Sequence, residues 1–112
     1  MPIINLTKNN IVIKNIIFAD SFYKKMKGLL GRKSLPQDTG MLFTGAKQIH
    51  CFFMGFTIDV VFLDKRKKVI KIYHNLKPWR VTSYILRAKY VFELPEGTAR
   101  NADLSEGDKM SW

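Results

Sequence analysis

The residues best able to do chemistry gather between Gln48 and His74, a stretch that holds the only cysteine and both histidines. His50 and Cys51 are adjacent, but neighbours in an extended strand point to opposite faces, so they cannot form a nucleophile–base pair with each other. Neither histidine stands in a metal-ligand spacing such as H-x3-H. We therefore expect a buried structural cysteine, no metal site, no cofactor and no catalytic residues.

A pocket of mixed character is the main functional hypothesis. In an extended strand His50 and Met54 share one face, and Asp59 follows a few residues later. Trp79 and Arg80 lie on a proline-stiffened loop, where a rigid strand core can present them. Arginine supplies a bidentate fork for an anion, and tryptophan supplies a stacking face. These five residues predict a non-enzymatic binding module for a small anionic or planar ligand.

Other readings of the same residues stay open. Asp59 sits among apolar residues and must be satisfied by a partner or by water, so it could simply cap a turn. Trp79 could anchor its loop to the core. A hydrolase-type enzyme that uses His50 and Asp59 is a further functional alternative.

A basic cluster predicts a rival partner, single-stranded RNA or DNA. Cations interleaved with aromatic side chains can bind single strands through phosphate contacts and base stacking. No known nucleic-acid motif accompanies the cluster, and a solvated hairpin tip is the usual reason for such a run of charge. The residues of this alternative site are Lys65, Arg66, Lys67, Lys68 and Lys71.

Length, composition and charge limit the number of domains and the kinds of partner that we expect. The chain has 112 residues, which suggests a single domain over residues 1–112, and 46% hydrophobic residues support a globular fold. The net charge is +10, and 17 of the 19 basic residues against four of the nine acidic ones precede residue 90. This asymmetry suits an anionic partner, although lysine-rich solubility explains it equally well. Phosphate-binding and nucleophile-elbow glycine motifs are absent.

The expected location is the cytoplasm, with no membrane partner. One cysteine excludes an internal disulfide and fits a reducing compartment. The first residues lack a charged start followed by an apolar block, and no apolar run approaches the length of a membrane span. The oligomeric state is left open.

Hydrophobic patterning predicts an α+β fold. Ile58–Leu63 and Val69–Tyr73 form a hairpin around a charged turn, and the first arm is apolar on both faces, which is typical of a central strand. The segment of about residues 20–31 has an apolar stripe and predicts one amphipathic helix. About seven short strands then form a compact mixed sheet of barrel-like character. The other expected strands are Ile11–Ala19, Gly40–Phe43, Lys89–Leu94 and Lys109–Trp112, with one helical turn over Ala99–Asp103.

Six motifs in order resemble the uncharacterised family catalogued as domain of unknown function 192. They are GLLGR from Gly28, GMLF from Gly40, IHCFFMGFTIDVVFLD from Ile49, LKPW from Leu76, FELPEGT from Phe92 and EGD from Glu106. The resemblance covers about residues 14–112 and implies a fold but no reaction. The resemblance implies that many members carry an export segment, and the first residues of this sequence do not predict one. Relatives often place Lys or Arg where this chain has Gly55, which would weaken an anion site there.

Overall fold

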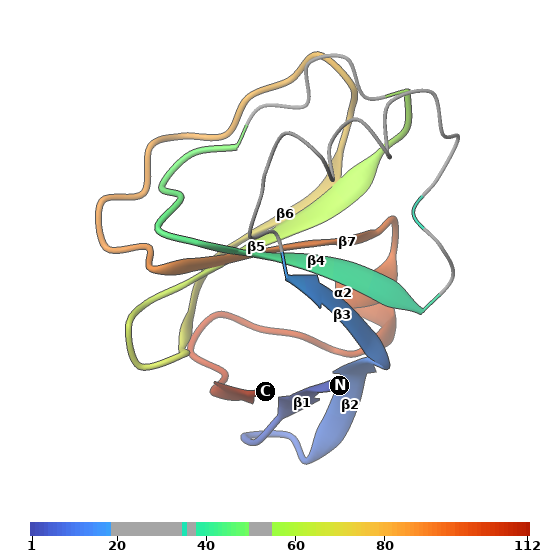
Figure 1. The fold of residues 1–112 in the computed structure, drawn as a ribbon, viewed down its shortest axis with the longest axis vertical. Helices are drawn as coiled ribbons and strands as arrows, with labels where there is room; N and C mark the ends of the chain where they lie inside the picture. Colours follow the sequence, from blue (N-terminus) through green and yellow to red (C-terminus); the bar gives the residue numbers. More distant parts are fainter. Residues whose placement is uncertain (19–34, 36–37, 50–54) are drawn as a thin grey trace.

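Eight strands form two sheets in the part of the chain that the structure describes (Figure 1). The computed structural model describes residues 1–18, 35, 38–49 and 55–112. The smaller sheet has the strand order β2-β1-β8, and the larger sheet has the order β3-β4-β7-β5-β6. The elements are β1 Ile3–Asn5, β2 Asn10–Ile13, β3 Asn15–Phe18, β4 Thr39–Thr44, β5 Ile58–Leu63, β6 Val69–Leu76, β7 Tyr90–Pro95, α2 Thr98–Asn101 and β8 Met110–Ser111.

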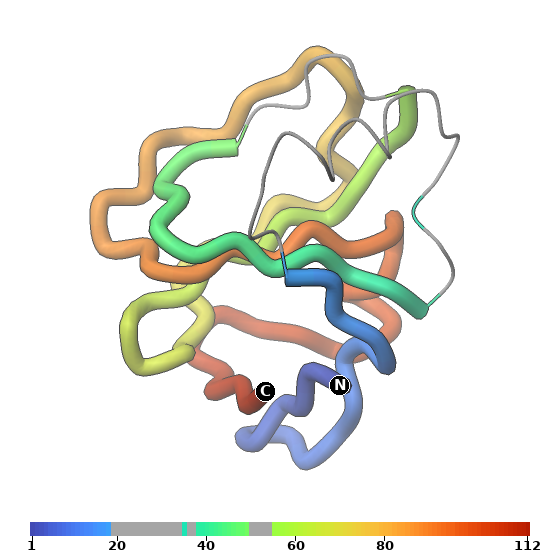
Figure 2. Tube along the Cα trace, viewed as in Figure 1, coloured from blue at the N-terminus to red at the C-terminus, as the bar shows by residue number. Residues whose placement is uncertain are grey.

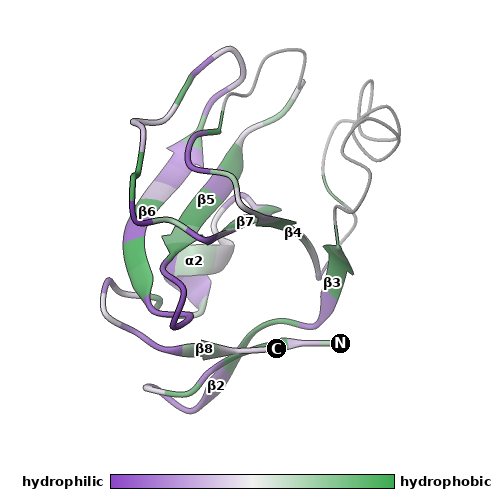
Figure 3. Cartoon of the chain, turned by 60° about the vertical axis from the view of Figure 1, so that its left-hand side comes forward, coloured by the Kyte–Doolittle hydropathy of each residue, from purple (hydrophilic) through white to green (hydrophobic). Residues whose placement is uncertain are grey.

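The predicted hairpin lies in the larger sheet. All six residues of β5 are buried, because one apolar core covers each face of the strand. β5 pairs antiparallel with β6 on one side and with β7 on the other. β6 is an edge strand whose buried and exposed positions are mixed. Figure 3 shows the difference as a largely hydrophobic β5 beside a β6 of mixed character. The prediction that β5 is central because both of its faces are apolar is confirmed.

The strand expected over Ile11–Ala19 is instead two strands in different sheets. β2 pairs antiparallel with β1, whereas β3 pairs parallel with β4, so the chain changes sheets at Lys14. The main chain supports this change, because the Asn15 N–H donates to the Asp38 carbonyl at 3.0 Å, just before β4 begins. The β3–β4 pair makes the larger sheet mixed, as predicted.

Two apolar cores lie on the two faces of the larger sheet. The helix-side core packs the smaller sheet and α2 against one face and includes Ile3, Val61, Phe92, Leu94 and Ala99. The loop-side core covers the other face and includes Met41, Phe43, Val60, Phe62 and Val91. Figures 1 and 2 show the smaller sheet below the larger one and the connection between β6 and β7 above it.

Close packing within the larger sheet depends on one glycine. A Cβ atom at Gly40 would lie 2.8 Å from Leu94 Cδ2 and 3.3 Å from the Glu93 carbonyl oxygen. Glycine therefore allows the start of β4 to approach β7.

The α+β class is confirmed, with eight described strands rather than about seven. The described strands do not close into a barrel. The helical turn expected over Ala99–Asp103 is α2, which begins one residue earlier, at Thr98. The amphipathic helix expected at about residues 20–31 lies outside the described residues.

Candidate functional site

Asp59 lies in the interior of the protein. Its side chain is 0% exposed, and each carboxylate oxygen accepts a main-chain hydrogen bond. Oδ1 accepts from the Asn75 N–H at 2.9 Å, and Oδ2 accepts from the Ala99 N–H at 3.0 Å. Asp59 therefore joins β5 to β6 and to α2.

Both donors need this acceptor. Opposite Asp59, β6 has one extra residue, because Ile58 pairs with Leu76 whereas Val60 pairs with Tyr73. Within this bulge Asn75 adopts a left-handed conformation, with φ 56°. At α2 the N-cap residue is a glycine and no side chain from the helix itself caps the N–H groups. Asp59 supplies the acceptor in both places, which is a structural role.

Trp79 and Arg80 lie on an exposed turn after β6. The Arg80 N–H donates to the Lys77 carbonyl at 3.3 Å, Pro78 follows Lys77, and Trp79 has φ 65°. Proline at the second position and a positive φ at the third are the features of a type II turn. Trp79 is 61% exposed, and Arg80 is also exposed.

Asp59, Trp79 and Arg80, the three predicted pocket residues that the structure describes, thus do not line one common pocket. A ligand in solvent can touch Trp79 or Arg80, but it cannot touch the buried carboxylate of Asp59 without a rearrangement. His50 and Met54, like Cys51, lie outside the described residues. Their contribution to a ligand site stays a prediction, and so does the hydrolase hypothesis, which needs His50.

The basic hairpin tip is held in one shape by Asp64. Its Oδ1 accepts from the N–H groups of Arg66 at 2.8 Å and Lys68 at 3.1 Å. The Lys67 N–H donates to the Asp64 carbonyl, and Lys67 itself has φ 64°. Lys65, Arg66 and Lys68 are exposed on this turn.

Two of the five predicted cations have contacts elsewhere. The Lys67 ammonium lies 4.1 Å from the centre of the Trp112 ring and donates to the Trp112 carbonyl at 3.4 Å. The Lys71 ammonium lies 5.4 Å from the centre of the Tyr73 ring. Such cation–π contacts stabilise the side chains in place by about 0.5–1 kcal/mol at exposed sites.

Arg87 joins the hairpin tip from a distant part of the chain. Asp64, Lys65, Arg66 and Arg87 line a surface cavity of about 410 Å³, which we call the basic notch. Three of its four lining residues are cationic, and one oxygen of Asp64 already accepts two main-chain hydrogen bonds. The notch therefore presents a net positive charge to a ligand.

The main chain on both sides of Arg87 is fixed. The Lys47 ammonium donates to the carbonyls of Leu86 and Ala88, at 2.8 Å each. Ala88 is 1% exposed, and the Lys89 N–H donates to the last residue of β5 at 2.8 Å. Sequence reasoning missed Arg87, because nothing in the pattern of residues 81–88 indicates where this segment lies.

Glu93 is also an acidic residue in the interior, but unlike Asp59 it has a carboxylate oxygen without a hydrogen-bond partner. It is 2% exposed, it lies in β7 between Met41 of β4 and Val60 of β5, and it faces the loop-side core. Its Oε2 is buried without a hydrogen-bond partner. Burial raises the pKa of Glu93 from an ordinary value of 4.5 to about 7.

Neither a metal-binding cluster nor a membrane-spanning helix is found in residues 1–18, 35, 38–49 and 55–112. No three His, Cys, Asp or Glu side chains there come close enough together to hold a metal ion. In the same residues no helix is both long and apolar enough to cross a bilayer.

Together, the fold and the notch define a small α+β protein with an accessible cationic site on rigid main chain. The chain belongs to the family DUF192, described as "Uncharacterized ACR, COG1430", whose model matches residues 4–112. This confirms the resemblance seen in the sequence.

Curated relatives extend over nearly the whole chain. UPF0127 protein PH1112 of Pyrococcus horikoshii is 36% identical, covering 98% of this chain and 97% of its own length. UPF0127 protein TK1120 of Thermococcus kodakarensis is 34% identical, covering 98% of this chain and 72% of its own. These names assign no activity.

Two solved structures share the fold. A Novosphingobium aromaticivorans protein of unknown function has a TM-score of 0.78 at 20% identity, covering 100% of this chain and 84% of that one. A Sinorhizobium meliloti protein, whose name proposes a transcription regulator, has a TM-score of 0.72 at 23% identity, covering 98% and 89%. At these identities the likeness concerns the fold alone.

Replacing Asp59 should destabilise the protein strongly. Asp59→Ala leaves the buried N–H of Ala99 and the partly buried N–H of Asn75 without an acceptor. A buried unsatisfied group costs about 1–3 kcal/mol and a partly buried one less, so we expect a loss of about 2–4 kcal/mol of unfolding free energy. Asp59→Asn keeps one acceptor and should lose less. Urea denaturation measures both. Asp64→Ala is the matched control, because water can replace its exposed carboxylate, and an equal loss in this control would contradict the structural role of Asp59.

Stability should fall as the pH rises through the titration range of Glu93. A raised pKa in the fold means that the neutral acid is favoured, so its contribution is complete below about pH 4.5 and is lost by about pH 7. The difference of roughly 2.5 pH units corresponds to about 3 kcal/mol. Glu93→Gln should remove this part of the pH dependence in urea denaturation at pH 5 and pH 8. The exposed neighbour variant Glu96→Gln should keep it. An unchanged pH dependence in Glu93→Gln would show that Glu93 is not the group responsible.

Proposed function

We propose that this protein is a binding module for a small anionic ligand, and that the basic notch holds the anionic group. The observation that carries the proposal is the convergence of Lys65, Arg66 and Arg87 on one cavity from two separate segments. A volume of about 410 Å³ lies within the range of small-molecule sites. Arginine forks suit a phosphate or carboxylate, which they can bind through two hydrogen bonds.

The hydrogen-bonded segments on both sides of the notch favour ligand binding over a role in which its cations are only solvated. Asp64 holds the hairpin turn, and Lys47 holds the main chain beside Arg87. A preformed site loses less conformational entropy when a ligand arrives. Trp79 and Arg80 lie on the turn at the opposite end of β6 from the hairpin tip, so a stacking contact at Trp79 and an anion contact at Arg80 remain a separate part of the proposal. So does a cytoplasmic location, which the single cysteine fits.

Inorganic pyrophosphate is the probe for the notch, measured by isothermal titration calorimetry at physiological salt. Arg87→Gln should weaken binding about fivefold to tenfold, because one charge-assisted hydrogen bond at an exposed site contributes about 1–1.4 kcal/mol. Arg100→Gln, on α2, removes the same charge from a residue that does not line the notch and should leave binding unchanged. Equal weakening by both variants would mean that binding follows net charge. Unchanged binding in Arg87→Gln would overturn the notch as the site.

A second candidate function is binding of single-stranded RNA or DNA. The β6–β7 loop, residues 77–89, carries four of the eight large hydrophobic side chains that are exposed in the described residues. Its cations alternate with them and continue into the hairpin tip through the notch. The exposed apolar side chains of this loop are Trp79 at 61%, Val81 at 52%, Tyr84 at 62% and Leu86 at 73%.

Hydrogen bonds to segment 45–49 hold this loop in place. The Thr82 N–H donates to the Ile49 carbonyl at 2.8 Å, and the Ile85 N–H donates to the Lys47 carbonyl at 2.7 Å. The Ser83 N–H donates to the Tyr73 hydroxyl at 2.9 Å. Figure 2 shows the two segments side by side. The exposed aromatic side chains thus project from main chain that hydrogen bonds hold in place, as a base-stacking surface requires.

Fluorescence anisotropy of a labelled oligouridylate across a salt series separates the two functions. Binding through the loop should weaken linearly with the logarithm of salt concentration. Tyr84→Ala should weaken RNA binding by about tenfold, because each stacked base contributes about 1–3 kcal/mol, and should leave pyrophosphate binding intact. No RNA binding at low salt would retire this candidate and leave the small-anion function in place.

A further inference from the structure

The basic notch contains one carboxylate among its three cations. Asp64 lines the cavity together with Lys65, Arg66 and Arg87. Both ion pairs found among the described residues involve Lys8, so the Asp64 carboxylate is paired with none of the notch cations. It therefore keeps acceptor capacity at the site where we place the anionic ligand.

The two oxygens of Asp64 have different partners. Oδ1 accepts the N–H groups of Arg66 at 2.8 Å and Lys68 at 3.1 Å, which fixes the carboxylate on the turn. Among the hydrogen bonds of the described residues, none reaches Oδ2. The turn thus uses a single oxygen, which an asparagine side chain could also supply. Oδ2 is the acceptor that remains for a ligand.

The ligand group that meets Oδ2 has to be a hydrogen-bond donor without a positive charge. An ammonium group would suit the carboxylate, but the three cations that line the same cavity would repel it. A hydroxyl group is uncharged, donates one hydrogen bond and can accept others from arginine or lysine. A hydroxyl group close to the anionic group therefore suits both kinds of lining residue.

The notch has room for both groups and holds their contacts apart. Its volume is about 410 Å³, whereas a phosphate group fills the space of only a few water molecules, each of about 30 Å³ in the liquid. The Lys47 ammonium donates to the carbonyls of Leu86 and Ala88, so the main chain that carries Arg87 is fixed relative to the sheet. A ligand therefore meets the carboxylate and the cations in an arrangement that the fold sets in advance.

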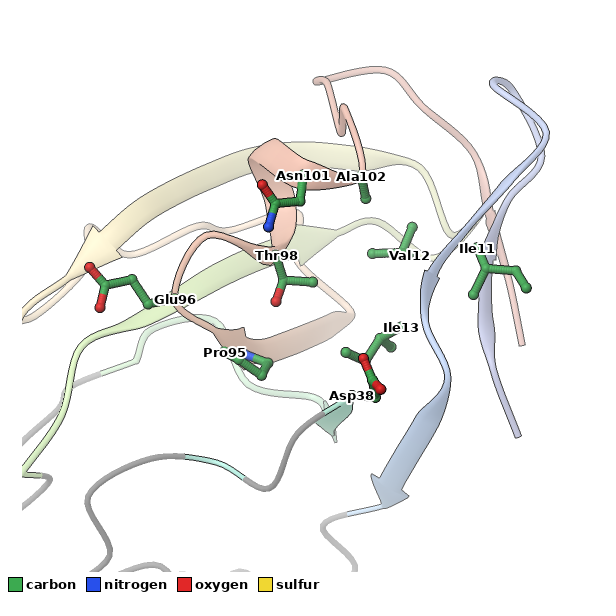
Figure 4. Close-up of a pocket in the computed structure, with 9 residues that line it drawn as sticks. All are labelled: Ile11, Val12, Ile13, Asp38, Pro95, Glu96, Thr98, Asn101 and Ala102. Atoms are coloured by element: carbon green, nitrogen blue, oxygen red, sulfur yellow. The ribbon is translucent and has the colours of Figure 1, made fainter.

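The cavity between β2 and α2 lacks this arrangement. Its volume is about 470 Å³, and its charged lining residues are Asp38 and Glu96. Figure 4 shows these two side chains on separate parts of the wall, so their carboxylates do not converge. No cation lines this cavity. A ligand that carries an anionic group beside hydroxyl groups is therefore matched by the notch and not by this cavity.

We infer that the basic notch binds a phosphate ester of a small polyol, such as a sugar phosphate. The phosphate group contacts Arg66 and Arg87, and a hydroxyl group of the polyol donates to Oδ2 of Asp64. This inference rests on the proposed small-anion function and names the class of ligand.

Glycerol 1-phosphate and propyl phosphate are the probes, because they carry the same phosphate group on the same carbon chain and only the first has hydroxyl groups. Each is titrated into isotopically labelled protein and followed by amide chemical shifts, which should concentrate at residues 64–68 and 86–88. Glycerol 1-phosphate should bind about fivefold more tightly than propyl phosphate, which corresponds to about 1 kcal/mol for one hydrogen bond to a charged acceptor in an open site.

Asp64→Asn should lower this ratio of affinities to about twofold or less, because a neutral amide forms a weaker hydrogen bond with a hydroxyl group than a carboxylate does. Asparagine keeps Oδ1 for the turn, so the fold should be kept. Both phosphates should bind this variant more tightly, because one negative charge is lost, so the ratio is the readout. Asp103→Asn removes the same charge outside the notch and should keep the ratio. Arg87→Gln should weaken both phosphates and also keep it.

Three results would overturn the inference and leave the small-anion function in place. The first is equal affinity of the unmodified protein for the two phosphates. The second is a ratio that Asp64→Asn leaves unchanged, and the third is binding of pyrophosphate at the notch without binding of either phosphate ester. If pyrophosphate also failed to bind, the proposed function would be wrong as well.

Discussion

The two hydrogen bonds accepted by Asp59 are the constraint on which the rest of the structure depends. One of them satisfies an N–H in the bulge of β6, 16 residues from Asp59, and the other satisfies an N–H at the start of α2, 40 residues from Asp59. The position of α2 closes the helix-side core. Asp59 therefore supports the fold from the interior, where it contacts no ligand in solvent.

Some charged side chains of this protein are paired within the fold, and others are not. Burial alone raises the pKa of Asp108, but hydrogen bonds from Asn5, the Ser105 N–H and Lys8 outweigh it and hold that pKa below its usual value. This network joins the first and last strands. The cations of the notch take part in none of the ion pairs found among the described residues, which join Lys8 to Asp103 and Asp108.

Local patterns in the sequence predict those parts of the fold that depend on neighbouring residues. The apolar faces of β5, the charged turn before β6 and the end of β7 at Pro95 follow from residue type and alternation. The sequence also indicates that Asp59 needs a partner, but the donors are 16 and 40 residues away and are main-chain groups with no signature. The division of Ile11–Ala19 depends on which sheet each half joins. The approach of Arg87 to Arg66 depends on the path of an irregular loop.

Glu93 contrasts with the other interior acids, because its surroundings are apolar and favour an apolar residue at this position. Asp59 and Asp108 are buried with their oxygens engaged, so each carboxylate contributes to the architecture. The neighbours of Glu93 across both ladders, Met41 and Val60, are apolar, and its Oε2 has no donor. Leucine or methionine at this position would avoid the cost of burying a carboxyl group, which is about 1–3 kcal/mol even when it is neutral. Natural sequences tend to break such rules at functional positions. Glu93 is therefore the interior acid whose burial the described fold does not offset with a hydrogen bond to Oε2.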